Sequence, residues 1–224
     1  MAKRGSDTQA AEQFAQERER MVTRQIANRG VRNPAVLAAM RIVPRELFVP
    51  EAYRAYAYDD TPLPIPADQT ISQPYVVAYM IAALDLEPAD RVLEIGTGSG
   101  YAAAVLSRMV AKVYTVERHR ILADYARQRL AEAGYDNVQV RQGDGTRGWP
   151  ENAPYDGIIV AAGGPSVPLS LQQQLAVGGR LVMPVGRSRH QQQLVLLTRV
   201  AEDAYTDEIL APVAFVPLIG DEGW

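Results

Sequence analysis

The chain of 224 residues contains no cysteine, which excludes disulfides, cysteine-bound metals and a thiol nucleophile. It has two histidines, His119 and His190, too few for a histidine-rich metal site, so we expect no metal cofactor. Apolar runs of the roughly 20 residues that a membrane span requires are also missing. Residues 1–20 lack the apolar centre of a secretory signal. We therefore expect a cytoplasmic protein without a membrane partner.

Positive charge is not in excess either, because 23 Lys and Arg are set against 26 Asp and Glu, which gives a net charge of −3. This balance provides no general attraction to nucleic acid or to an anionic membrane surface. The hydrophobic content of 47% and the charged content of 22% are typical of a globular chain. We expect residues 1–224 to form a single domain that acts as a monomer without a nucleic acid partner.

The chain is organised around one stretch, Arg91–Tyr101, which reads Arg-Val-Leu-Glu-Ile-Gly-Thr-Gly-Ser-Gly-Tyr. An apolar strand is followed by glycine at every second position and then by an alanine-rich segment that favours helix. Glycine lets the backbone approach a ligand closely, and a strand, a glycine turn and a helix N-terminus form a small-molecule site. An ordinary tight turn is the alternative interpretation of the glycines alone.

Glu117 ends the next apolar segment, Lys112–Glu117, where an acidic side chain can accept hydrogen bonds from ribose hydroxyls. A dinucleotide fingerprint would read G-x-G-x-x-G, but this chain reads G-x-G-x-G and has Tyr101 where the third glycine of the fingerprint would fall. The pattern therefore favours S-adenosylmethionine over a nicotinamide dinucleotide. A plain acid at a strand end is the alternative interpretation of Glu117.

Strand-like and helix-like segments alternate after residue 91, which predicts a parallel sheet with right-handed crossovers. The end of the chain differs, because residues 193–200 and 209–218 are two strand-like runs with no helix between them, as in an antiparallel hairpin. The predicted strands before this hairpin span 91–95, 112–116, 137–141, 155–160 and 180–184, and the predicted helices span 10–28, 74–84, 101–110, 119–133 and 169–178, with a short helix from Pro34.

The predicted fold class is α/β, a Rossmann-like methyltransferase fold for an S-adenosylmethionine-dependent enzyme. It combines a mainly parallel sheet, a C-terminal antiparallel hairpin and an N-terminal helical extension. Residues 1–85 are expected to form the helical region beside the substrate cleft, and residues 86–224 the cofactor-binding core.

Motifs through almost the whole chain resemble those of the protein-L-isoaspartate O-methyltransferase family. The most specific are Val43–Pro50 (Val-Pro-Arg-Glu-Leu-Phe-Val-Pro) and Gln69–Tyr75 (Gln-Thr-Ile-Ser-Gln-Pro-Tyr), whereas the glycine stretch is common to many methyltransferases. The resemblance implies transfer of a methyl group from S-adenosyl-L-methionine to the α-carboxyl of L-isoaspartyl residues (in the family, also D-aspartyl residues), which leaves S-adenosyl-L-homocysteine. The ester then collapses to a succinimide that reopens partly to normal aspartate. The expected partners are therefore isoaspartyl-containing proteins and peptides. The other matching stretches are 92–101, 116–117, 143–145, 155–160, 179–186 and 215–218.

The same resemblance implies the site residues. Ser72 is the expected catalytic residue, because its hydroxyl and backbone N–H can hold one carboxylate oxygen and aim the other at the methyl group. The alternative is that Ser72 caps the helix that starts near Pro74. Asp144 is expected at the adenine amino group, with an Asp-Gly turn as the alternative. The expected cofactor-binding residues are Thr70, Ile71, Ser72, Glu94, Gly96, Thr97, Gly98, Ser99, Glu117, Arg118, Asp144 and Gly145.

The sequence Pro66-Ala67-Asp68 departs from the family's pattern, because family members usually carry a glycine-containing turn at this point. We expect the replacement to stiffen a lid over the site. Residues 215–218 are expected to border the peptide cleft, with a buried edge strand as the alternative. Three rival functions remain: a methyltransferase that acts on RNA or a small molecule, a nicotinamide dehydrogenase, and a non-catalytic module that binds S-adenosylmethionine.

Overall fold

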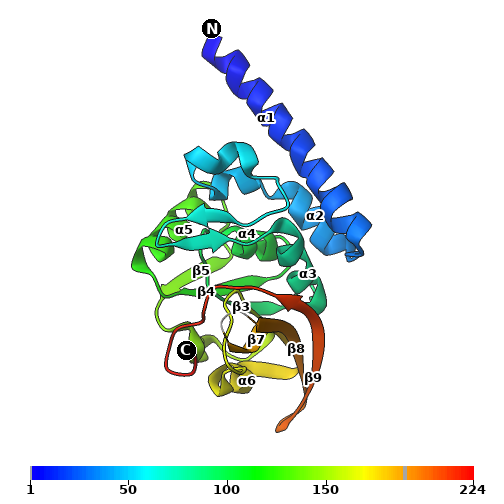
Figure 1. Cartoon of the computed structure of the whole chain (residues 1–224), viewed down its shortest axis with the longest axis vertical. Helices are drawn as coiled ribbons and strands as arrows, with labels where there is room; N and C mark the ends of the chain where they lie inside the picture. Colours follow the sequence, from blue (N-terminus) through cyan, green and yellow to red (C-terminus); the bar gives the residue numbers. More distant parts are fainter. Residues whose placement is uncertain (1, 189–190) are drawn as a thin grey trace.

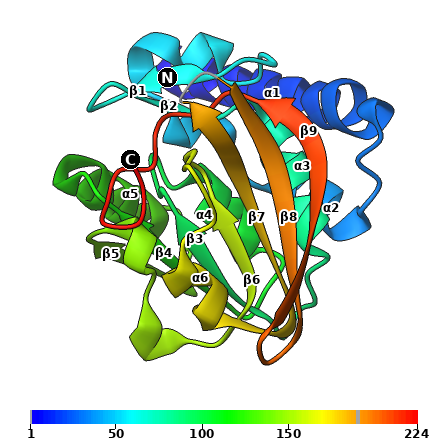
Figure 2. The same ribbon diagram turned by 60° about the horizontal axis from the view of Figure 1, so that its bottom comes forward.

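The structure, a computed structural model, describes residues 2–188 and 191–224, so His190 lies outside the described residues. A seven-stranded sheet in the order β5-β4-β3-β6-β7-β8-β9 forms its centre (Figures 1 and 2). Strands β3 to β7 run parallel, and β8 and β9 extend one edge as an antiparallel hairpin, as predicted. The strands are β3 (Arg91–Ile95), β4 (Lys112–Glu117), β5 (Val138–Gln142), β6 (Tyr155–Val160), β7 (Leu175–Ser188), β8 (Gln191–Ala201) and β9 (Ala204–Val213).

The two faces of the sheet support two hydrophobic clusters. Successive residues of a strand point to opposite faces, so Val92 packs in the cluster under α3, α4 and α5, while Leu93 packs in the cluster under α6. The first cluster also contains apolar side chains of the N-terminal region, which is thereby joined to the sheet. The helices are α1 (Ala2–Arg20), α2 (Pro34–Ile42), α3 (Pro74–Leu84), α4 (Tyr101–Ser107), α5 (Arg120–Glu132) and α6 (Leu169–Gln174).

The strand order creates a switch point at the middle of the sheet. From β3 the chain winds outward through β4 to β5, then returns to place β6 on the other side of β3. The loops that follow β3 and β6 therefore leave in opposite directions, which opens a crevice at the carboxyl ends of these strands. Ligands of open α/β sheets bind at such a crevice, so the topology places the expected site after Ile95, Glu117 and Val160.

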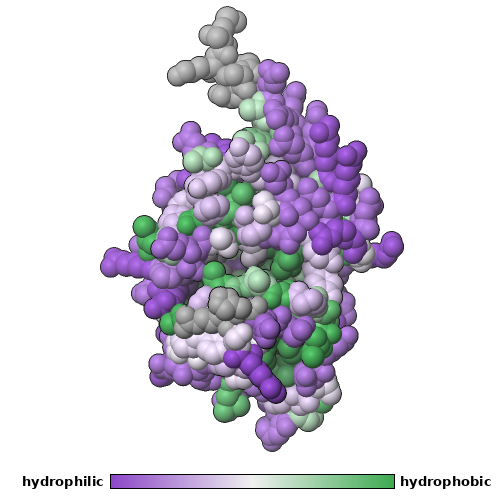
Figure 3. Space-filling view, in the orientation of Figure 1, coloured by the Kyte–Doolittle hydropathy of each residue, from purple (hydrophilic) through white to green (hydrophobic). Residues whose placement is uncertain are grey.

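The N-terminal region lies above this edge of the sheet. Helix α1 begins at Ala2, well before the predicted start at residue 10, and projects from the body (Figure 1). A π-helix, η1 (Met21–Ile26), and a short 3-10 helix, η2 (Ala27–Arg29), follow it, and Gly30 ends them with a φ of 101°. Hydrophilic side chains cover the part of α1 whose side chains the structure describes, and apolar residues gather lower on the same face (Figure 3).

Helix α2 starts as its sequence predicts. Pro34 is its first residue, and the Asn33 side chain accepts hydrogen bonds from the backbone N–H groups of Ala35 and Val36 at 3.0 and 3.2 Å. These bonds satisfy two of the donors that a helix start leaves unpaired. The turn that ends the helix leads directly into the Val43–Pro50 motif.

Several predicted boundaries differ from the structure. Helix α6 ends at Gln174 rather than near Gly178, because Leu175 already pairs with Tyr155 as the first residue of β7. Strand β9 spans Ala204–Val213 rather than 209–218, and the rest of that segment runs on as an extended tail. The segment before Ser72 forms a hairpin of β1 (Leu63–Ile65) and β2 (Gln69–Ile71), which the sequence did not predict.

Candidate active site

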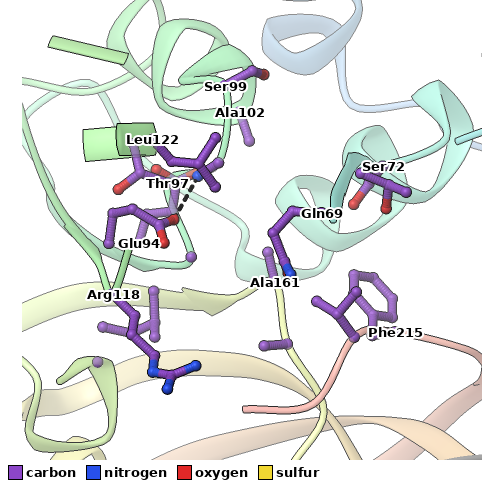
Figure 4. A pocket seen from close by; sticks show the side chains of 18 of the residues that line it. Gln69, Ser72, Glu94, Thr97, Ser99, Ala102, Arg118, Leu122, Ala161 and Phe215 are labelled. Atoms are coloured by element: carbon purple, nitrogen blue, oxygen red, sulfur yellow. Dashed lines mark hydrogen bonds between the residues drawn. The ribbon is translucent and has the colours of Figure 1, made fainter. Parts of the chain in front are cut away.

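A cavity of about 360 Å³ opens at the carboxyl ends of β3, β4 and β6, in the size range of small-molecule sites (Figure 4). Its walls come from the glycine loop after β3, the hairpin β1–β2 with the following loop, the end of β6 and the C-terminal tail. Of the predicted cofactor residues, those that line it are Thr70, Ile71, Ser72, Glu94, Gly96, Thr97, Gly98, Ser99, Glu117, Arg118 and Gly145. Asp144 lies outside this lining.

The glycine loop owes its shape to three glycines with positive φ, Gly96, Gly98 and Gly100. Gly98 has a φ of 53°, and its N–H donates to Glu117 Oε2 at 2.9 Å. Gly100 has a φ of 91°, and a Cβ there would lie 3.3 Å from the Cβ of Ala126 in α5. A side chain at either position would strain the backbone. The loop therefore presents backbone to the cavity at the start of α4, which suits close approach of a ligand.

Glu117 is held in place by two backbone donors. Its Oε2 accepts from Gly98, and its Oε1 accepts from the N–H of His119 at 2.8 Å. The side chain is buried, with an exposed fraction of 5%. An ionised carboxylate has about four acceptor positions, so two remain for donors from the cavity. Ribose hydroxyls are donors of this kind, and the geometry fits the predicted role of Glu117.

Glu94 lies deeper, at the floor of the cavity. Thr115 Oγ1 donates to its Oε2 at 2.5 Å, and Thr115 in turn lies 2.6 Å from Thr97 Oγ1. The other oxygen, Oε1, has no hydrogen-bond partner within the described residues. Burial, reinforced by the nearby charge of Glu117, raises the pKa of Glu94 to about 8. The free oxygen leaves room for one more polar group of a bound ligand.

This buried acid predicts that the cofactor-free protein loses stability as the pH rises. The Glu94 carboxyl ordinarily has a pKa of 4.5, whereas its pKa in the fold is about 8. Above the lower value, the folded state keeps a proton that the unfolded state has lost, so the free energy of unfolding falls until the pH passes the higher value. Glu94→Gln keeps the shape of the protonated acid. Its melting temperature should therefore exceed that of the parent at about pH 9 and lie close to that of the parent at about pH 5.

Differential scanning calorimetry across this range tests the expectation. Glu132→Gln, on the exposed side of α5, is the matched control because it removes a carboxylate that solvent reaches. An equal fall in melting temperature with rising pH in the parent and in Glu94→Gln would contradict this prediction.

Ser72 lies across the cavity from Glu94 and Thr97, in the loop between β2 and α3 (Figure 4). The capping alternative does not hold, because the N-cap of α3 is Gln73 and no side chain caps it. The carbonyl oxygen of Ser72 accepts a hydrogen bond from Arg45 Nη2 at 2.9 Å. The backbone of Ser72 is thus anchored by Arg45, while the residue itself lines the cavity.

Asp144 uses its carboxylate within the protein. Oδ1 accepts from the backbone N–H and the hydroxyl of Thr146, and Oδ2 accepts from the N–H of Asp221 at 2.9 Å. Burial opposes ionisation, but these hydrogen bonds outweigh it and hold the pKa of Asp144 below its ordinary value. Asp144 therefore ties the C-terminal tail to the turn after β5. Its neighbour Gly145 reaches the cavity, and contact of Asp144 with adenine stays a prediction.

The C-terminal tail forms a wall that faces Ser72 (Figure 4). The backbone of Phe215 is held by Gln192, whose Oε1 accepts from the Phe215 N–H at 2.8 Å and whose Nε2 donates to its carbonyl at 3.1 Å. Gly163 holds the tail further on, through Val216 and Leu218 at 2.8 Å each. No signal in the sequence marks Gln192, because a lone glutamine in a strand is usually a surface residue.

The tip of the hairpin β1–β2 also lines the cavity, and it is built without glycine. Ala67 and Asp68 have φ values of 60° and 54°, in the left-handed region that ordinarily favours glycine. Ile65, next to the turn of the hairpin, reaches within 3.4 Å of the position that a Cβ on Gly98 would occupy. The hairpin thus covers the glycine loop. A stiffer lid, expected from Pro66-Ala67-Asp68, remains a prediction.

The described residues contain no cluster of three or more His, Cys, Asp or Glu side chains that could hold a metal ion. Nor does the described part of the chain contain a helix long and apolar enough to cross a membrane.

Comparison with known proteins gives a consistent family. A family model described as protein-L-isoaspartate(D-aspartate) O-methyltransferase (PCMT) matches residues 16–223. Protein-L-isoaspartate O-methyltransferase 1 of Rhodopseudomonas palustris strain HaA2 is 64% identical over 214 residues, which cover 96% of this chain and 87% of that protein. Protein-L-isoaspartate O-methyltransferase 2 of Pelobacter propionicus is 62% identical over 207 residues, which cover 92% of each chain.

Solved structures agree with these sequence matches. A structure named protein-L-isoaspartate O-methyltransferase superposes with a TM-score of 0.84 at 32% identity, covering 92% of this chain and 67% of that one. The crystal structure of a PCMT from Plasmodium falciparum, in complex with S-adenosyl-L-homocysteine, gives a TM-score of 0.77 at 24% identity and covers 90% of this chain and 98% of that one. The second match shows a shared fold.

Proposed function

The chain belongs to the protein-L-isoaspartate(D-aspartate) O-methyltransferase family, and we propose that it methylates the α-carboxyl of L-isoaspartyl residues in damaged proteins and peptides, with S-adenosyl-L-methionine as the methyl donor. The observation that carries this proposal is the arrangement of one cavity. The glycine loop and Glu117, which suit the nucleoside, lie on one side, and Ser72 lies on the other. A donor and an acceptor can therefore meet between them.

The residues present fit this cofactor. Glu117 keeps two acceptor positions free for ribose hydroxyls after its bonds to Gly98 and His119. The unpartnered Oε1 of Glu94 can accept a hydrogen bond from an ammonium group. Thr97 and Ser99 also line the cavity, and Gly98 lets the backbone approach a ligand closely. The cavity is thus acidic and rich in acceptors, as a cationic nucleoside requires.

The reaction needs little chemistry from the protein itself. When bound, S-adenosylmethionine supplies a sulfonium methyl group that the substrate carboxylate attacks, so that a C–O bond forms as the C–S bond breaks and S-adenosylhomocysteine and a methyl ester result. A carboxyl of ordinary pKa, near ~4, is already ionised at neutral pH, so no general base is required. We assign to Ser72 the task of holding one carboxylate oxygen with its hydroxyl while the other oxygen stays free to attack.

The methyl ester explains how repair begins. Esterification turns the carboxylate into an acyl group that the neighbouring backbone nitrogen can attack, with loss of methanol and closure of a succinimide ring. The ring reopens by hydrolysis at either carbonyl, which returns part of the product to normal aspartate. The protein therefore initiates repair, and the later steps need no further group from its active site.

Methyl transfer from radiolabelled S-adenosylmethionine to a synthetic peptide with one L-isoaspartyl residue tests the proposal. The matched control is the same peptide with normal aspartate. Label on the isoaspartyl peptide alone, released by mild base as an ester should be, is the expected result. If neither peptide is labelled while calorimetry shows that the cofactor still binds, the isoaspartyl substrate is contradicted. The enzyme would then act on another acceptor, such as RNA or a small molecule.

We also propose that residues 1–224 act as one domain, as a cytoplasmic monomer without a nucleic acid partner. The net charge of −3 supports the last point, because it gives the chain no general attraction to phosphate backbones. Sedimentation of the purified protein tests the monomeric state. Fractionation of cells that produce it tests the location.

A further inference from the structure

Arg45 is a buried cation for which the proposed reaction has no task. It begins the turn η3 (Arg45–Phe48) within the Val43–Pro50 motif, and its exposed fraction is 0%. Arginine is almost never fully buried unless it is paired with an acid. Nε and Nη2 of Arg45 instead donate to neutral backbone carbonyls, and the carboxylate of Asp60 acts on Arg45 only through its charge. A charge buried in this way calls for an explanation.

The guanidinium group of Arg45 anchors Ser72. Its Nε donates to the carbonyl oxygen of Ala57 at 2.7 Å, and its Nη2 donates to the carbonyl oxygen of Ser72 at 2.9 Å. Ala57 follows the turn η4 (Glu51–Tyr56), which is part of the N-terminal region. A planar guanidinium holds two acceptors in a fixed mutual geometry, which the single ammonium of lysine does not. Arg45 therefore fixes Ser72 to the scaffold of the N-terminal region.

The same group also lies against the cofactor side of the cavity. The guanidinium carbon of Arg45 is 4.8 Å from the centre of the Tyr101 ring, within the range of a cation–π contact. Tyr101 is fully buried and is the first residue of α4, directly after Gly100 of the glycine loop. One side chain thus contacts both the segment that carries Ser72 and the helix that begins at the glycine loop.

Stability alone gives a poor account of this side chain. Removal of a guanidinium from water costs free energy, and apolar side chains of similar volume often serve stability equally well. Moreover, Nη1 of Arg45 makes no hydrogen bond within the described residues. Burial lowers the pKa of Arg45, but a guanidinium remains charged throughout the pH range in which proteins fold. The feature that an apolar residue lacks is the directed bond to the Ser72 carbonyl.

We propose that Arg45 is a positioning residue for methyl transfer, which holds Ser72 at a fixed distance from the glycine loop. The inference rests on the proposed function, because Ser72 is there assigned to hold the attacking carboxylate. Direct displacement requires reacting atoms about 3–3.5 Å apart, and a displacement of about 1 Å can cost on the order of 100-fold in rate. Arg45 acts on kcat through Ser72 and touches neither reactant.

Two variants and a double-mutant cycle test the proposal. Arg45→Lys keeps the charge but loses the planar guanidinium that binds two carbonyls at once. Arg45→Met removes the charge and keeps most of the volume. Each is expected to lower kcat for an isoaspartyl peptide by at least about tenfold, with the dissociation constant of S-adenosylhomocysteine in calorimetry within about threefold of the parent. In a Ser72→Ala background, Arg45→Lys should lower kcat by less than about twofold, because the group that it positions is gone.

Arg199→Lys is the matched control. The Arg199 guanidinium also donates to backbone carbonyls, those of Leu175 and Glu202, and it lies 5.8 Å from the Tyr205 ring. This arrangement is at the far hairpin, away from the cavity. The control also loses a guanidinium that binds two backbone carbonyls, and its kcat should equal that of the parent.

Each remaining outcome decides against the proposal. An unchanged kcat in both Arg45 variants overturns it, as does an equal loss of kcat in the Ser72 and Ser72→Ala backgrounds. If both variants fail to fold, as shown by loss of the helical circular dichroism signal and of cofactor binding, Arg45 is needed for stability and the positioning role is rejected. A parent enzyme that methylates no isoaspartyl peptide removes the proposed function itself, and this result is distinct from an active parent whose Arg45 variants remain equally active.

Discussion

Replacement of Glu117 by alanine is expected to weaken the binding of S-adenosylmethionine at least about tenfold. The substitution removes the only carboxylate that both reaches the cavity and carries hydrogen bonds from the described backbone on each of its oxygens. A hydrogen bond to a charged group contributes about 1.5–3 kcal/mol, and each 1.4 kcal/mol is about a factor of ten in affinity. Loss of one ribose contact is therefore enough to produce the expected change.

A second effect acts through the glycine loop in the same direction. Without Glu117, the N–H groups of Gly98 and His119 lose their acceptor in a partly buried place. The loop then has fewer bonds to hold its left-handed conformation at Gly98, so binding must also order it. Glu117→Gln should fall between the parent and Glu117→Ala, because an amide can accept from one of the two N–H groups and opposes the other with its own donor.

Isothermal titration calorimetry with S-adenosylhomocysteine measures this effect directly. Glu151→Ala serves as the control, because it removes an acid that pairs with Arg141 at the surface, outside the cavity lining. Comparison of melting temperatures separates loss of affinity from loss of fold. An unchanged dissociation constant in Glu117→Ala would remove Glu117 from the proposed cofactor site.

The sequence predicts the core of this fold because one physical signal dominates there. The segments at β3, β4 and β6 are short apolar runs bounded by turn residues, and burial on both faces of a parallel sheet requires such runs. The apolar pattern does not decide the structure where the same residues suit both a helix and a strand. Leu175 has the spacing of a helix face with Leu171, but an apolar residue suits the start of β7 equally well, and its pairing with Tyr155 decides the outcome.

The hairpin β1–β2 escaped prediction for a different reason. Alternate prolines argue against a strand, yet Pro64 is exposed and lies at the centre of a three-residue edge strand, where a missing N–H costs little. Its turn gives no local signal, because Ala67 and Asp68 adopt the left-handed conformation without glycine. The hairpin is stabilised from outside by contacts such as that of Ile65 over the glycine loop, which are not visible along the chain.

The candidate site was predictable to the extent that its residues belong to recognisable motifs. The predicted residues from Thr70 to Arg118, together with Gly145, line one cavity, whereas Asp144 faces the C-terminal tail. An Asp-Gly pair has the same appearance in a turn and in a ligand site, so only the position of the partner N–H groups distinguishes the two. Arg45 and Gln192 could not be assigned from sequence, because their contacts are backbone atoms far along the chain.

Ser72→Ala is expected to lower kcat for an isoaspartyl peptide by about ten- to a hundredfold while the protein stays folded. Ser72 lines the cavity, and α3 does not depend on its hydroxyl for capping, so we expect the substitution to leave the local structure intact. The backbone of Ser72 also stays anchored, because the bond from Arg45 goes to its carbonyl oxygen. In the proposed mechanism, the substitution removes one hydrogen bond to a charged carboxylate, worth about 1.5–3 kcal/mol, which restricts the approach of the attacking oxygen.

The effect on kcat distinguishes positioning from simple binding. If Ser72 held the substrate equally well before and during transfer, its loss would raise KM and leave kcat unchanged, so a fall in kcat at saturating peptide identifies a contact that matters in the transition state. Ser107→Ala is the control, because Ser107 is a buried serine whose hydroxyl bonds the carbonyl of Ala104 within α4. Unchanged kinetics in Ser72→Ala would leave the orientation of the carboxylate to backbone groups alone.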